Sequence, residues 1–158
     1  MKIFALLLCS LIAIILSCGS NFIHQTHDVR RKDSIKTEYY VIHIDSIASP
    51  SQVEYGKSFT AAFYGIVGGN SCYSLDRIER KDILSGEVIS FYGRYESGPN
   101  IGCFDAVAFL GRMGMITDDG RLINEGKLLE FIPEKRGVYI ISVIQPDGSF
   151  LSDTTIVQ

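Results

Sequence analysis

Short runs in which apolar and polar residues alternate follow one another from Glu38 onward, and they limit the fold more than any other feature. Tyr40, Ile42 and Ile44 alternate with more polar neighbours, and the same period of two recurs from Ser58 to Val67. A period of two places alternate side chains on opposite faces of a β-strand. After the first seventeen residues no apolar pattern of helical period extends over a dozen residues. The chain is therefore predicted to be all-β.

Turn residues divide the remaining sequence into further strands. The Gly68-Gly69-Asn70 cluster is predicted to break the strand that begins at Ser58, and Ser85-Gly86 is predicted to be a turn. With seven to nine short strands in about 120 residues, two packed antiparallel sheets are the simplest arrangement. Besides the two runs above, strands are expected at 53–55, 72–80, 87–95, 104–110, 128–132, 140–144 and 150–157.

The last strands carry a family resemblance. Gly137-Val138-Tyr139 leads into an apolar strand, and the turn 145–148, with its proline and Asp-Gly, joins it to the final strand. This pattern resembles the closing strands of immunoglobulin-like domains, where a tyrosine near the start of the penultimate strand fixes a corner. Ile141 stands where antibody domains carry their second cysteine, and the chain has no tryptophan. The resemblance implies a single Ig-like antiparallel β-sandwich over residues 38–158.

The N-terminus has the pattern of a signal peptide. Lys2 is followed by the uncharged, mostly apolar run Ile3 to Leu16. A helix that crosses the hydrocarbon core of a membrane needs about 20 apolar residues, so this run is too short for a membrane span. Polar residues of mixed charge follow it as far as Thr37 and show no strand or helix period. Residues 1–17 are predicted to be a processed leader, and residues 18–37 a flexible tether.

Ile15-Leu16-Ser17-Cys18 resembles the lipobox of bacterial lipoproteins. The resemblance implies cleavage before Cys18 and acylation of Cys18, with several acyl chains giving firm membrane attachment. Together with the β domain, the chain resembles the Ig-like lipoproteins common in Bacteroidota. Surface-exported lipoproteins of this group tend to carry an acidic run just after the cysteine, and residues 19–27 contain no acid. We therefore expect an outer-membrane protein that faces the periplasm.

The same resemblance implies one disulfide bond. Of the four cysteines, Cys9 lies in the leader and Cys18 would carry the lipid. Cys72 and Cys103 remain, and in an oxidising compartment they are expected to pair. They lack the CxxC spacing that is typical of redox-active pairs.

Composition excludes one class of partner. The formal net charge is −3, and Lys and Arg form no cluster along the sequence. Nucleic-acid binding needs such clusters, so no nucleic-acid partner is expected. A protein or glycan partner remains compatible with this composition.

Tyr92 and Arg94 are the candidate ligand contacts. They are two residues apart on a predicted strand and would share its solvent face, where an aromatic ring can stack on a ligand and a guanidinium can donate hydrogen bonds. Asn100 lies in a nearby loop. These residues support one alternative function, that of an accessory glycan- or peptide-binding protein.

No catalytic, cofactor or metal pattern is evident in the sequence. His24 and His27 are interpreted as solvated tether residues, His43 as an ordinary strand residue, and Asp118-Asp119-Gly120 as a tight turn. A second alternative is a hydrolase whose acids converge only in the fold. Its candidate carboxylates are Asp76, Glu96 and Asp105. The leading hypothesis is a membrane-tethered, non-catalytic binding or structural module.

Replacement of the lipidated cysteine tests the predicted attachment. In the variant Cys18→Ala the acyl chains have no acceptor, so the protein should move from the membrane fraction to the soluble fraction. Quantitative immunoblotting of the two fractions is the measurement. A variant that still sediments with membranes would show that the lipid assignment is wrong.

Overall fold

The computed structural model describes residues 34–111, 115–116, 122–123 and 126–158. The leader, Cys18, the tether histidines His24 and His27, and the predicted turn at 118–120 lie outside the described residues. The first strand begins at Lys36, within the segment that was predicted to be tether.

The described residues form strands and no helix, which confirms the prediction of an all-β chain. The long strands end close to the predicted boundaries, because turn residues stop them. The strands are β1 (Lys36–Val41), β2 (Ser46–Ala48), β3 (Gln52–Val53), β4 (Phe59–Tyr64), β5 (Ile66–Asn70), β6 (Tyr73–Ile83), β7 (Gly86–Ser97), β8 (Asp105–Phe109), β9 (Met115–Ile116), β10 (Leu122–Ile123), β11 (Lys127–Phe131), β12 (Gly137–Ile144) and β13 (Phe150–Val157).

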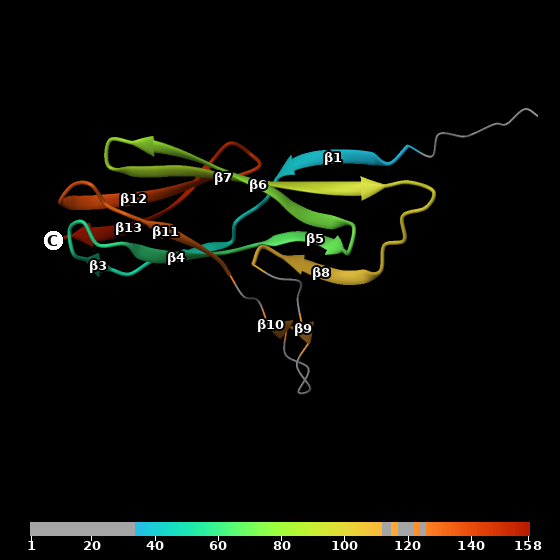
Figure 1. Ribbon diagram of the computed structural model, residues 1–158, viewed down its shortest axis with the longest axis horizontal. Coiled ribbons are helices and arrows are strands. Elements are labelled where there is room, and N and C mark those ends of the chain that lie inside the picture. Colours follow the sequence, from blue (N-terminus) through green and yellow to red (C-terminus); the bar gives the residue numbers. More distant parts are fainter. Residues whose placement is uncertain (1–33, 112–114, 117–121, 124–125) are drawn as a thin grey trace, which may run out of the picture. The chain divides into compact units, whose positions relative to one another are not determined.

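Two sheets pack face to face around the core (Figure 1). In one sheet, β1 and β12 both pair with one edge of β7, β6 pairs with the other edge of β7, and β13 and then β3 follow β12. The other sheet has the order β11-β4-β2. Phe91 of the first sheet and Phe63 of the second are fully buried, with ring centroids 5.2 Å apart. The alternation read from the sequence thus places one apolar face of each sheet in a β-sandwich. Two further strand pairs are β5-β8 and β9-β10.

The strand directions differ from the predicted purely antiparallel arrangement. β12 runs parallel to β7, and β13 runs parallel to β3. The orders β11-β4-β2 and β7-β12-β13 follow the order of immunoglobulin-like sheets. In those sheets the penultimate strand is antiparallel to its neighbour, whereas here the penultimate strand, β12, is parallel to β7. The reversal arises because the β6-β7 hairpin presents its second strand, rather than its first, to β12.

A bulge in β6 decides which side chains face the core. Leu75 pairs with Gly93 and Arg77 pairs with Tyr92, so Asp76 is an extra residue without a partner across the ladder. The extra residue shifts the alternation by one. Leu75, Ile78 and Arg80 consequently all point to the inner face of the sheet. The three-residue step from Leu75 to Ile78 explains the irregular apolar spacing of this strand in the sequence.

The Gly68-Gly69-Asn70 cluster does not break the strand as predicted, because it lies within β5. Register shifts accompany this segment where it pairs with β8. The ring of Tyr73 occupies the space where a side chain of Gly68 would be, so this glycine allows an aromatic ring to pack against the backbone.

Cys72 and Cys103 form a disulfide bond, as expected. Their Cα atoms are 5.3 Å apart, and they are 31 residues apart in sequence. Cys72 directly precedes β6, and Cys103 lies two residues before β8. The bond therefore closes a loop that contains the whole β6-β7 hairpin, and it fixes the start of β8 beside the end of β5.

Removal of this bond should lower stability without changing the fold. For a closed loop of this length, the double variant Cys72→Ala/Cys103→Ala should lose about 3 to 4 kcal/mol of unfolding free energy. Urea unfolding followed by circular dichroism is the measurement, and wild type under reducing conditions should match the variant. An unchanged midpoint in both would contradict a stabilising role.

Candidate functional site

A buried charged cluster lies where the inner faces of the sheets meet the β6-β7 turn. Glu87 of β7 has a side chain only 10% exposed, and Arg80 of β6 donates two hydrogen bonds to its carboxylate, at 2.6 and 2.8 Å. The Tyr139 hydroxyl of β12 donates a third hydrogen bond, at 2.9 Å. Side chains from two neighbouring strands, β6 and β12, therefore satisfy one buried carboxylate, as such a burial requires.

Aromatic rings and a backbone carbonyl hold the cluster in place. The Arg80 guanidinium lies 4.6 Å from the ring centroid of Phe131 and also donates to the Glu130 carbonyl oxygen. The Tyr139 ring lies edge-on to Phe59, with centroids 5.7 Å apart. Each charged or polar group of the cluster thus has a partner, as a polar network inside a core requires.

The same contacts shift two pKa values. Hydrogen bonding to Glu87 raises the pKa of Arg80 above its usual value. Burial, and then the hydrogen bond to Glu87, raise the pKa of Tyr139. Both groups therefore keep their protons at neutral pH: Arg80 stays charged, and Tyr139 stays a neutral donor.

Tyr139 also departs from the immunoglobulin-like expectation. In those domains the corner tyrosine bonds to backbone a few residues upstream. Here its hydroxyl bonds to the Glu87 side chain on the neighbouring strand. The resemblance therefore located a structurally important tyrosine but not its partner.

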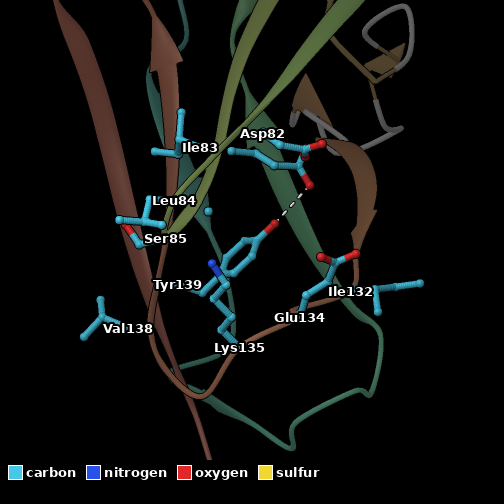
Figure 2. Close-up of a pocket in the computed structure, with 11 residues that line it drawn as sticks. Asp82, Ile83, Leu84, Ser85, Ile132, Glu134, Lys135, Val138 and Tyr139 are labelled. Carbon is cyan, nitrogen blue, oxygen red and sulfur yellow. Dashed lines mark hydrogen bonds between the residues drawn. The ribbon is translucent and has the colours of Figure 1, made fainter.

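Four exposed apolar side chains surround a cavity over this cluster, and we call them the tip (Figure 2). Leu84 in the β6-β7 turn is 85% exposed, and the others are 40 to 61% exposed. Exposed apolar residues gathered at one place commonly mark a contact site. The tip consists of Ile83, Leu84, Ile132 and Val138.

The cavity itself has a volume of about 170 Å³. Sites for drug-sized ligands typically occupy about 300–1,000 Å³, so this cavity accommodates a single side chain or a similarly small group. Figure 2 shows Tyr139 between the Ile83-Leu84-Ser85 turn and Glu134. The cavity thus combines apolar walls with the hydroxyl of Tyr139 and the charges of Glu134 and Lys135.

The predicted ligand contacts, Tyr92 and Arg94, lie on the opposite, outer face of β7. The buried residues Ile89 and Phe91 alternate with them, as predicted. The Arg77 guanidinium covers the Tyr92 ring at 4.0 Å. Arg94 donates from Nε to the Ser74 hydroxyl at 3.0 Å and lies 3.5 Å from Glu96. Both side chains therefore already have protein partners.

Sequence reasoning missed the aromatic residue beside Arg94. Tyr39 of β1 lies directly across the ladder from Arg94 and is 62% exposed. Cross-strand neighbours of this kind have Cβ atoms about 5 Å apart, so their side chains are close enough to act together. Only the β1-β7 register reveals this pair.

The candidate acids of the hydrolase alternative do not converge on a described cavity. Asp76 bonds to Arg77 in the β6 bulge, Glu96 lies beside Arg94 on β7, and Asp105 begins β8. None of them lines the tip cavity or the second cavity, which lies beside Tyr73 and Phe109. The described residues contain no group of three potential metal ligands. His43 is an exposed residue 3.6 Å from Asp45.

The chain matches no protein-family model, no curated protein and no solved structure. Within the described ranges no helix is long and apolar enough to span a membrane.

Two matched substitutions measure the strength of the buried cluster. Tyr139→Phe removes a hydrogen bond to a charged acceptor and should cost about 2 kcal/mol of unfolding free energy. Tyr40→Phe removes only a hydrogen bond to the Val67 carbonyl, so it should cost about 1 kcal/mol. Chemical unfolding of both variants at pH 7 gives the comparison. An equal or smaller loss for Tyr139→Phe would refute the importance of the carboxylate.

Proposed function

We propose that this chain is a lipid-anchored, non-catalytic binding module whose tip contacts a protein partner. The observation that carries the proposal is the position of the tip at the opposite end of β7 from Lys36, where β1 begins. The proposed anchor is Cys18, on the periplasmic side of the outer membrane.

The β7 strand sets this separation. Lys36, where the tether joins β1, pairs with Ser97 at one end of β7, and Gly86 at the other end adjoins the tip. A strand rises about 3.3 Å per residue, so these ends are roughly 36 Å apart. A domain tethered at the Ser97 end can therefore present its tip away from the membrane.

The chemistry of the tip favours a protein over a sugar. Leu84, Ile132 and Val138 offer aliphatic surface, whereas sugars stack on flat aromatic rings. The small cavity behind them suits one apolar side chain of a partner, and the neighbouring charges of Glu134 and Lys135 can define its orientation.

A glycan-binding function is the alternative, and one observation favours it. Tyr39 and Arg94 place an exposed ring beside a guanidinium on the outer face of β1 and β7. This pair could stack on a sugar ring and donate to its hydroxyl groups. A binding screen against oligosaccharides tests it, with Tyr39→Ala as the variant that should lose any retention.

Site-specific photocrosslinking in intact cells tests the protein-binding proposal. A photoreactive residue in place of Leu84 should give a discrete protein adduct, because the tip would lie in the interface. The matched control is position 128, since Leu128 is also aliphatic and 64% exposed but lies on β11. The added change Ile132→Asp should abolish the Leu84 adduct. No adduct, or equal adducts at both positions, would reject the tip as the binding surface.

A further inference from the structure

One edge of the six-stranded sheet is left open along β1. In the described part of the chain β1 pairs only with β7. Its residues from Lys36 to Tyr39 are exposed, and the strand contains no proline and no bulge. An unpaired edge presents a row of backbone donors and acceptors that another strand can match.

The register identifies which backbone groups are free. The Ile42 amide donates to the Phe91 carbonyl, and these two residues continue the β1-β7 register. In an antiparallel ladder, directly hydrogen-bonded pairs alternate with pairs that point their backbone groups away. The even-numbered residues of β1 therefore bond to β7. Thr37, Tyr39 and Val41 direct their amides and carbonyls to the open edge.

Two other long edges, those of β6 and β11, are protected. The free edge of β6 carries a bulge at Asp76 and a dense run of charged side chains from Asp76 to Asp82. On the second sheet, Arg80 donates to the Glu130 carbonyl of β11. Charges and bulges of this kind are the usual protection against strand pairing. β1 carries only two charged side chains, Lys36 and Glu38, which pair with each other, and it exposes Tyr39, a residue that favours strands.

We propose that the β1 edge binds an extended segment of a partner protein by strand addition. The free amides and carbonyls of Thr37, Tyr39 and Val41 would form the main-chain hydrogen bonds. Alternate side chains of the guest segment would lie beside Tyr39 on the outer face. This mode gives affinity through the backbone and selectivity through alternate side chains. The inference is independent of the tip, which lies at the other end of β7.

The sheet geometry favours a single segment over a second copy of the domain. β6 occupies one edge of β7 along the residues that pair with β12 and most of those that pair with β1. β1 and β12 must therefore both lie on the other edge of β7, one after the other along it. A strand added to β1 would therefore lie end to end with β13. β13 lies one strand further out than β1 on this side of the sheet. If two domains paired through their β1 strands, the β13 strand of each would have to fit beside the other domain, whereas a single added strand meets only one β13.

Peptide selection on the full-length chain in detergent tests the proposal. The probe is a phage-displayed library of random twelve-residue peptides, and each selected peptide is then measured by its dissociation constant. Thr37→Pro removes a free amide and places a ring on the open edge, while the bonds of β1 to β7 remain. Selected peptides should bind this variant at least about tenfold more weakly. They should bind Thr37→Val unchanged, since it keeps the amide.

Amide hydrogen exchange supplies a second readout. The amides of Thr37, Tyr39 and Val41 should exchange quickly in the free protein and slowly with peptide bound, whereas the Tyr40 amide should be slow in both states. Three outcomes would overturn the proposal: no selected peptide, equal binding to both Thr37 variants, or protection of other amides only. Slow exchange at the three amides in the free protein would also overturn it, because the chain itself or a second copy would then cover the edge.

Discussion

Hydrogen bonding on both edges of β7 is the constraint on which the rest of the structure depends. One edge pairs with β6 along most of its length, and the other is shared by β12 and β1. Every remaining strand of the six-stranded sheet connects to β7 through β12. Its inward side chains, Ile89 and Phe91, are fully buried and form the centre of the core. Large losses of stability are therefore expected for changes that disturb this strand.

The core is closed by polar groups at two places. Glu87 is satisfied by Arg80 and Tyr139 at the tip end. Where the chain passes from the first sheet to the second, the buried Gln145 side chain accepts from the Ile44 amide and donates to its carbonyl. Apolar burial drives the sheets together, while these directional bonds favour the observed arrangement at the two places where they form.

The sequence was sufficient to predict most of the long strands, since alternation and turn residues are local signals. It did not predict the short strands β2, β9 and β10, or the continuation of β5 through Gly68-Gly69-Asn70. It also led to the Cys72-Cys103 pair, by elimination of the other cysteines. It could not predict that β12 runs parallel to β7, because strand order depends on long-range packing. The partnership of Glu87, Arg80 and Tyr139 was hidden for a related reason: the Asp76 bulge decides that Arg80 faces inward, and nothing in the local pattern marks that bulge.

The disulfide has a consequence for limited digestion. Its loop encloses the entire β6-β7 hairpin, including the protruding Leu84. A protease that cuts at this turn therefore cannot release either half, because the sulphur bridge keeps the two fragments on one covalent framework. Such a nicked molecule would stay in one piece, heavier by one water, until a reductant separates the fragments.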